Sequence, residues 1–206
     1  MRYQEDPEED DDDEGEEERS GGDDDKLQEK VLKTRTVLVC ESISDELARK
    51  VYQQLLILEA ESREKPITVL VNSPGGEADS GFGIYDMLRF VGAPVRTLVA
   101  GLCASAAVLV FLAGDKRHRY SLPHSRFLLH QPSSQSFGQA SDLQIASREI
   151  LRLRDRYNRI VADLTGTDLE TITRDSDRDF WMTAEEARDY GLVQQLIRER
   201  GEMDPD

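Results

Sequence analysis

The chain has 206 residues and a formal net charge of −16, and 38 % of its residues are hydrophobic. This length suits one domain with its own core. Residues 1–25 hold 15 acidic and two basic residues, so they account for −13 of the net charge and the rest is nearly neutral. No basic face is left for nucleic acid, no apolar run approaches the ~20 residues of a membrane span, and no signal-peptide pattern begins the chain.

The N-terminal segment and the two cysteines bear on the cellular compartment of the protein. Like charges without core-forming residues predict that residues 1–25 are a disordered acidic tail, which either solubilises the protein or serves as an interaction or gating arm. Residues 26–34 have no clear pattern. Cys40 and Cys103 sit in apolar stretches typical of buried free thiols, not of a disulfide or metal site. We therefore expect a cytoplasmic location, with an organelle as the alternative.

The first half of the chain alternates strand and helix. Short β-branched runs predict strands at 36–40, 67–72 and 95–100, the last ending at Gly101. Helical spacing and cap residues predict helices at about 45–62 and 80–91, and a third that follows Ser105 and runs to 113. Because a helix follows each strand, the pattern predicts an α/β fold with a parallel sheet.

The second half is dominated by one long helix. Short strands at 119–122 and 127–130 precede a polar loop at 132–138, and a helix follows from about 139 to 164. Its length exceeds that of an ordinary helix, and such a helix often packs against a partner. The remaining predicted elements are a short helix at 168–174, a charged turn at 175–181, a helix at 184–190 and a final apolar stretch up to Ile197. Residues 199–206 are predicted to form a polar tail.

A serine lies in a cluster of small residues where the third strand gives way to a helix. Ser105 lies within Gly101–Ala107. A helix N-terminus offers free N–H groups and a positive dipole end, both of which favour a developing negative charge. This position fits a nucleophile, and the alternative is a packing residue or a helix N-cap.

A nucleophilic serine needs a base and a group that orients the base. His118 lies in a basic turn and His124 in a loop, whereas His130 ends an apolar strand, where sites of α/β proteins gather. A buried structural role for His130 is the alternative.

The residues alone do not determine which acid orients the histidine or which backbone amides bind the oxyanion. Asp175, Asp177 and Asp179 cluster in one turn, and any of them could orient the histidine. The alternative is that they belong to a solvated turn and form ion pairs with the neighbouring arginines. Gly76 in the Ser-Pro-Gly-Gly turn and Ala106 next to the serine fit backbone oxyanion donors by type.

Ordered motifs run from about Arg35 to Ile197. They include Val71–Gly76, Gly101–Ala107, Leu122–Arg126, His130–Pro132, Gly138–Asp142, Arg148–Leu151 and Arg174–Asp179. Together they resemble the Clp protease proteolytic subunit (ClpP) family. The resemblance implies the ClpP/crotonase-like α/β fold, a spiral of β-β-α units with a protruding long handle helix.

The resemblance also implies roles for particular residues. Ser105 corresponds to the nucleophile, His130 to the general base and Asp179 to the residue that orients it. Gly76 and Ala106 correspond to the oxyanion donors, although the family usually has a larger residue such as methionine at 106. Asp177 and Arg178 resemble the pair that links ring contact to an ordered active site.

The implied organisation is a peptidase domain at 35–198, with a head at about 35–131 and 165–198 and a handle at about 132–164. Two seven-membered rings would stack through the handles and enclose the active sites of a serine endopeptidase that cuts polypeptides. No cofactor or metal is implied, and ATP would be used by a separate Clp-family ATPase.

The first 33 residues depart from the family. An acidic tail replaces the apolar gate segment, and Thr68 stands where an aromatic often lines the ATPase-docking pocket. A Clp ATPase or a ClpP paralogue as partner is therefore open. The alternatives for function are a catalytically idle ring subunit and crotonase-like acyl-CoA chemistry.

Overall fold

The computed structural model describes residues 26–133 and 137–203. The chain divides after Thr34 into two units, the second of which begins at Arg35. In the first, residues 26–32 are helical and end in a turn in which the Thr34 amide donates to the Val31 carbonyl at 2.9 Å. The predicted acidic tail, residues 1–25, lies outside the described residues, as do 134–136 of the polar loop and 204–206.

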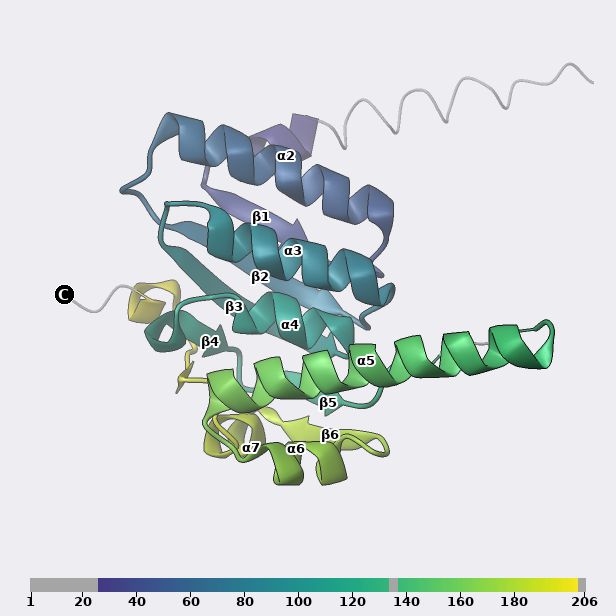
Figure 1. Cartoon of the computed structure of the whole chain (residues 1–206). Helices are drawn as coiled ribbons and strands as arrows, with labels where there is room; N and C mark the ends of the chain where they lie inside the picture. Colours follow the sequence, from purple (N-terminus) through teal and green to yellow (C-terminus); the bar gives the residue numbers. More distant parts are fainter. Residues whose placement is uncertain (1–25, 134–136, 204–206) are drawn as a thin grey trace, which may run out of the picture. The chain divides into compact units, whose positions relative to one another are not determined.

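The second unit contains one sheet and the helices that cover it (Figure 1). Its strands are β1 (Thr36–Val39), β2 (Ile67–Ser73), β3 (Val95–Ala104), β4 (Arg119–Ser121), β5 (Arg126–Leu129), β6 (Phe180–Thr183) and β7 (Gln195–Leu196). Its helices are α2 (Asp45–Glu61), α3 (Ala78–Phe90), α4 (Ala106–Leu112), α5 (Ala140–Thr165), α6 (Leu169–Asp175) and α7 (Ala184–Asp189), with 3-10 turns η1 (Lys116–His118) and η2 (Arg200–Met203).

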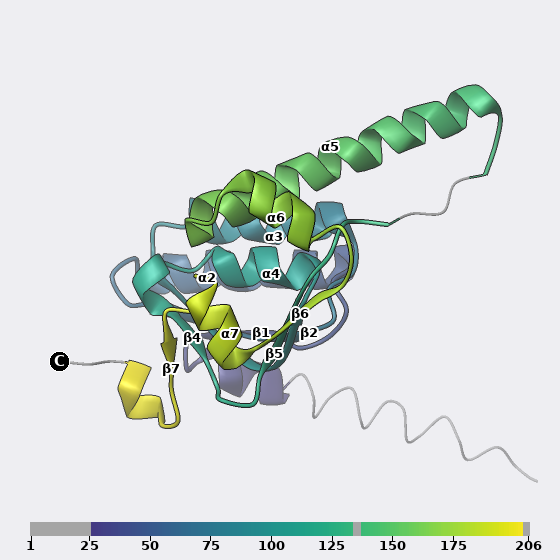
Figure 2. The ribbon, with the colours of Figure 1, turned by 90° about the horizontal axis from the view of Figure 1, so that it is seen from below.

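The strands that the alternating pattern predicts are parallel. Their order is β1-β2-β3-β4-β7, every neighbouring pair is parallel, and α2, α3 and α4 lie on one face (Figures 1 and 2). β5 continues the sheet beside the end of β3, and β6 pairs antiparallel with β5. The predicted α/β fold is thus confirmed, with one antiparallel edge that the sequence pattern did not indicate.

The third strand does not end at Gly101, and this prediction was wrong. β3 continues to Ala104, and its register with β2 jumps from Val71–Val99 to Ser73–Cys103. Gly101 has φ +110, and a Cβ there would lie 2.6 Å from the Asn72 Oδ1 atom. The glycine therefore marks a β-bulge inside the strand. Beyond the bulge β3 pairs with β5 instead of β4, which brings the Ser105 turn beside the β5 strand.

Helix α2 shows how the covering helices attach to the sheet. The Ser44 Oγ atom accepts a hydrogen bond from the Leu47 amide at 3.3 Å, so the predicted cap holds the first turn. The side chains buried along the helix are Leu47, Ala48, Val51, Leu55 and Leu58. Each fully buried aliphatic side chain contributes about 1.5–3 kcal/mol, which fixes the helix on the sheet.

Helix α4 is the core helix of the unit. All seven of its residues are buried. At its end the Arg119 side chain is 1 % exposed, and its guanidinium donates to the Leu112, Gly114 and Leu164 carbonyls at 2.8, 2.9 and 2.9 Å. Burial lowers the pKa of Arg119 to about 10, so the group remains charged at neutral pH. One cation thus caps the carboxyl ends of α4 and α5 together.

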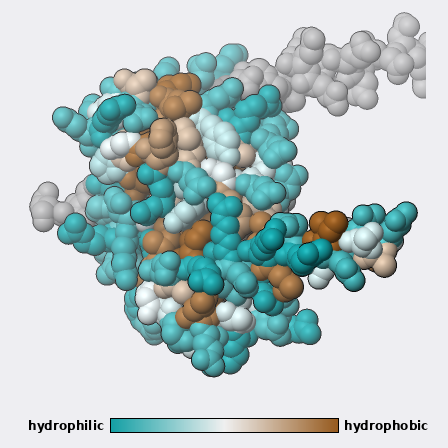
Figure 3. All heavy atoms as spheres, viewed as in Figure 1, coloured by the Kyte–Doolittle hydropathy of each residue, from teal (hydrophilic) through white to brown (hydrophobic). Residues whose placement is uncertain are grey.

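Helix α5 confirms the predicted long helix. It spans 26 residues, and its buried residues all lie in its second half, from Tyr157 to Thr165. The first half projects beyond the sheet and carries exposed apolar side chains among polar ones (Figures 1 and 3), namely Leu143, Ile145 and Leu151. In the part of the chain that the structure describes, no helix is long and apolar enough to cross a membrane.

Two further predictions need correction. Cys40 is exposed because it follows the last residue of β1, whereas Cys103 is fully buried as predicted. The chain end is not wholly a polar tail, because Met203 is 7 % exposed and packs with Tyr120 and Ile197. The Tyr120 hydroxyl donates to the Met203 carbonyl at 3.0 Å, which extends the packed unit to this residue.

Candidate active site

Ser105 lies at a sharp turn between β3 and α4. Its backbone has φ 56 and ψ −125, an uncommon conformation for a residue with a side chain. Its amide donates to the Leu128 carbonyl at 3.0 Å, so β5 holds the turn. Ser105 occupies the N-cap position of α4, but its side chain makes no capping hydrogen bond to the helix, which leaves the hydroxyl available.

The turn requires a glycine as neighbour. Gly75 has φ +88, and a Cβ there would lie 2.6 Å from the Ala104 carbonyl oxygen and 2.7 Å from the Ser105 Cβ atom. The Ser-Pro-Gly-Gly turn after β2 therefore passes directly against the serine.

His130 and Asp179 meet because β5 and β6 pair antiparallel. Leu129, the last residue of β5, lies opposite Phe180, the first residue of β6, so the residues just beyond the pair are neighbours. The His130 Nδ1 atom is 3.3 Å from the Asp179 Oδ1 atom, with the side chains 31 % and 63 % exposed. An imidazole held in this way presents its Nε2 atom on the other side of the ring.

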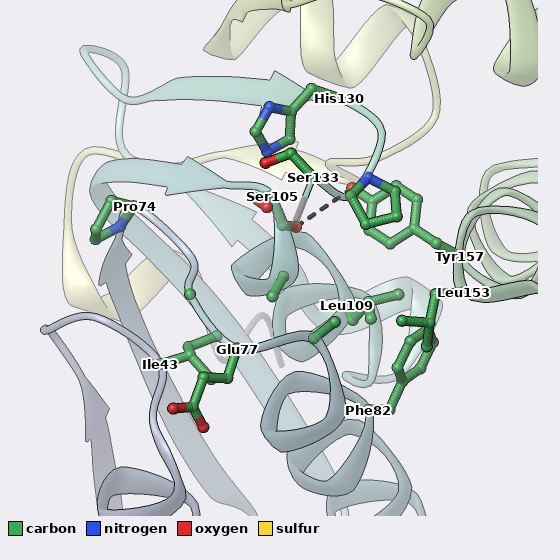
Figure 4. A pocket seen from close by; sticks show the side chains of 14 residues that line it. Ile43, Pro74, Glu77, Phe82, Ser105, Leu109, His130, Ser133, Leu153 and Tyr157 are labelled. Atoms are coloured by element: carbon green, nitrogen blue, oxygen red, sulfur yellow. Dashed lines mark hydrogen bonds between the residues drawn. The ribbon is translucent and has the colours of Figure 1, made fainter. Parts of the chain in front are cut away.

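Ser105 and His130 line one cavity of about 550 Å³ (Figure 4). Its apolar wall comes from α3, α4 and α5, through Phe82, Leu109, Leu153 and Tyr157. Within residues 26–133 and 137–203, no hydrogen bond joins Ser105 to His130. Neither His118 nor His124 lines this cavity, so the structure brings only His130 of the three histidines beside the serine.

The two expected backbone donors border the same cavity. Gly76 forms a parallel bridge with Ile43: the Gly75 carbonyl accepts from the Ile43 amide, and the Glu77 amide donates to the Ile43 carbonyl. The Gly76 amide therefore points to the opposite side, since N–H groups alternate along an extended chain. Ala106 is the first residue of α4, so its amide has no carbonyl partner within the helix.

The three aspartates of the charged turn have different partners. Asp175 accepts from the Tyr190 hydroxyl at 2.9 Å, and burial followed by this bond raises the pKa of Tyr190. The Asp177 carbonyl accepts from the Gln131 side chain at 2.8 Å. Asp179 alone of the three pairs with His130. Asp177 and Arg178 line a second hollow of about 530 Å³ beside His130.

Several residues that shape this site carry little signal in the amino-acid sequence. Ile43 and Gln131 lie in connecting segments without periodicity, and their contacts join parts distant along the chain. Tyr157 and Leu153 are spaced by four residues and so share a helix face, which indicates a packed surface but not a cavity. Among the described residues, no group of three histidine, cysteine or acidic side chains is placed to hold a metal ion.

A parallel α/β sheet with a serine at a strained strand-to-helix turn, close to a paired histidine and aspartate, is the architecture of a serine protease homologue. Comparison with known proteins defines the family. The model of the family described as Clp protease matches residues 19–200. The chain therefore belongs to the Clp protease family, as the motifs in its sequence indicated.

The similar proteins are proteolytic subunits. "ATP-dependent Clp protease proteolytic subunit 2" of Treponema denticola is 41 % identical over 177 residues, covering 86 % of this chain and 88 % of that protein. The protein of the same name from Pseudomonas aeruginosa is 48 % identical over 172 residues, covering 84 % and 85 %. The solved structure of a ClpP1 mutant from Listeria monocytogenes has a TM-score of 0.80 at 41 % identity and covers 86 % of this chain and 99 % of that one. This likeness confirms the predicted fold with its long helix.

Proposed function

We propose that this chain is a serine endopeptidase that hydrolyses polypeptides with Ser105, His130 and Asp179 as its catalytic triad. One observation carries the proposal. A serine at a strained turn, whose side chain makes no capping hydrogen bond, lines the same cavity as a histidine whose Nδ1 atom is 3.3 Å from an aspartate oxygen. Membership of the Clp protease family supports the same reading.

The reaction follows from the position of each group. The Ser105 Oγ atom attacks the peptide carbonyl carbon while the His130 Nε2 atom takes its proton, and Asp179 holds the other ring nitrogen. Collapse of the tetrahedral intermediate breaks the C–N bond, and His130 gives the proton to the departing amine. A water molecule, deprotonated by His130, then cleaves the acyl ester and restores Ser105.

The developing oxyanion would be bound by the Gly76 and Ala106 amides. Both border the cavity, and neither is taken up by the bridge to Ile43 or by helix α4. A pair of such donors stabilises charge that exists only in the transition state. The apolar wall of the cavity fits an apolar side chain next to the bond that is cut.

The same proposal includes an assembly. Seven-membered rings would stack in pairs through α5, and Asp177 and Arg178 would link that contact to the triad. The exposed apolar side chains on the projecting half of α5 support this role. In this proposal residues 35–198 form the peptidase domain, with its handle at 132–164. The proposed location is the cytoplasm. ATP would be used only by a separate Clp ATPase, and that partner or a ClpP paralogue would bind the rings.

A catalytically idle ring subunit is the second candidate. The one observation that favours it is that no hydrogen bond joins Ser105 to His130 in the described residues. Such bonds often form only in the substrate complex, so an active triad is compatible with this geometry as well.

Active-site labelling separates the candidates. We expect a fluorophosphonate to label the assembled protein at Ser105 and to leave Ser105→Ala unlabelled, with hydrolysis of short apolar peptides lost in the same variant. His130→Ala should slow labelling by at least about 100-fold, because the general base is lost. An assembled protein that is not labelled, cuts no peptide and co-purifies with an active paralogue would be an idle subunit.

A further inference from the structure

Two neighbouring residues in the buried half of α5 face different parts of the active site. Tyr157 and Asn158 are 6 % and 1 % exposed. Successive helix residues point about 100° apart, so Tyr157 reaches the serine cavity while Asn158 faces the segment around α6. Neither residue touches the reacting atoms that the proposed mechanism requires.

Tyr157 holds the peptide group between Ser105 and Ala106. Its hydroxyl donates to the Ser105 carbonyl at 3.3 Å (Figure 4). Burial raises the pKa of this phenol, so it remains a donor. A peptide bond is planar and trans, so fixing the Ser105 carbonyl also fixes the direction of the Ala106 N–H group. The side chain thereby orients the proposed oxyanion donor from the opposite end of the same peptide plane.

Asn158 holds the segment that carries Asp179. Its Nδ2 atom donates to the Thr173 Oγ1 atom at 3.3 Å, and the Thr173 hydroxyl donates onward to the Leu169 carbonyl at 2.7 Å. The amide oxygen is thus left facing Ser176, whose hydroxyl donates to it at 3.2 Å. Ser176 is fully buried and lies three residues before Asp179.

The acid segment is tied in turn to the base. Gln131 follows His130 in the chain, and its side chain donates to the Asp177 carbonyl at 2.8 Å. A connected set of hydrogen bonds therefore runs from Asn158 through Ser176 to the turn that carries Asp179, and from that turn to the neighbour of His130.

We propose that Tyr157 and Asn158 are positioning residues through which α5 sets the serine half of the triad against the histidine–aspartate half. Because both side chains arise from one turn of one helix, a displacement of α5 moves both halves of the site relative to the sheet. This inference rests on the proposed function and names the residues by which α5 acts on the catalytic groups.

Removal of single hydroxyls tests the Tyr157 contact. Tyr157→Phe deletes only the donor to Ser105. Tyr120→Phe is a matched control, because Tyr120 is also buried and donates to a backbone carbonyl, that of Met203. We expect Tyr157→Phe to lower kcat and the rate of fluorophosphonate labelling by about 10-fold with little change in KM, since the affected group acts in the transition state. Tyr120→Phe should stay within about twofold of the parent rates.

A second readout does not depend on catalysis. Amide hydrogen exchange in residues 105–108 should be faster in Tyr157→Phe than in Tyr120→Phe, because the turn opens more often. Equal exchange and equal labelling in the two variants would overturn the Tyr157 assignment. If the parent chain is not labelled, the proposed function fails, and the exchange comparison alone decides the positioning role.

Ser176→Ala tests Asn158 without burying a charge. It removes one hydrogen bond to the Asn158 oxygen, and we expect a several-fold loss of kcat with an unchanged KM and faster exchange in residues 176–179. Thr171→Ala, on the neighbouring helix turn, is its control, because the half-buried Thr171 is not a hydrogen-bond partner of Asn158, which bonds to Thr173 and Ser176. Exchange in residues 176–179 that matches the control would overturn the Asn158 assignment.

Discussion

At Ser105 the chain adopts a conformation that only its neighbours maintain. A residue with a side chain at φ 56 is strained by about 1–3 kcal/mol, so the surroundings must fix it. Here the Ser105 amide bonds to Leu128, and Tyr157 bonds to the Ser105 carbonyl. Gly75 completes the support, because it allows the preceding turn to approach within contact of the serine. The conformation of this serine is therefore maintained jointly by three strands and two helices.

Gly75→Ala should disable the site more than it unfolds the protein. Gly166→Ala is the matched control: the two glycines have φ +88 and +85, but a Cβ at 166 meets nothing within 4 Å, whereas one at 75 collides with Ala104 and Ser105. Each substitution should cost about 1 kcal/mol of stability from φ alone. We expect Gly75→Ala alone to lower the rate of fluorophosphonate labelling by about 100-fold, because the serine is displaced. Equal rates in the two variants would contradict this account.

Among the elements, α4 and α5 are joined at their ends as well as along their lengths. Helix α4 begins directly after the serine, and α5 supplies part of the wall of the cavity. Arg119 bonds the last carbonyls of both helices through one buried guanidinium. No carboxylate is needed, since three carbonyls and two helix dipoles face the charge.

Arg119→Met should therefore loosen both helices. Three buried carbonyls would lose a charged donor, and we expect the free energy of unfolding to fall by about 3–5 kcal/mol. Arg152→Met is the control, because Arg152 lies on the exposed part of α5 and its side chain is 75 % exposed, so its loss should change stability by less than about 0.5 kcal/mol. Urea unfolding followed by circular dichroism, at one protein concentration, gives both values. A loss below 1 kcal/mol in Arg119→Met would show that the carbonyls find other partners.

At the scale of the whole molecule, the local sequence pattern predicts the helices and strands, whereas the pairing of strands distant in the chain determines which residues meet at the site. The β–α alternation and the caps predict α2, α3 and the parallel strands, because both signals lie within a few residues. The bulge at Gly101 and the strand β6 were missed, because each depends on which strand lies alongside. For the same reason the residues alone left three aspartates open, whereas the β5–β6 register places Asp179 beside His130. Resemblance to a family supplied the correspondence that spacing could not.

On the proposed function, the projecting half of α5 would link assembly to catalysis. Its apolar side chains at Ile145 and Leu151 are 54 % and 45 % exposed in the single chain, while its other half holds Tyr157 and Asn158 in the site. If rings pair through this half, a charge placed there must be desolvated in the contact, which is strongly unfavourable. A weakened contact would then also release the helix that we propose positions the triad.

Ile145→Glu combined with Leu151→Glu should therefore separate paired rings and slow the serine together. We expect the sedimenting mass to fall by about half and the rate of fluorophosphonate labelling to fall by about 10-fold or more, because α5 loses its fixed position. Gln53→Glu adds a charge at an exposed polar position of α2 instead and should preserve both mass and rate. A double variant that separates but labels at the parent rate would show that α5 holds the site without its partner, and one that stays paired would place the ring contact elsewhere.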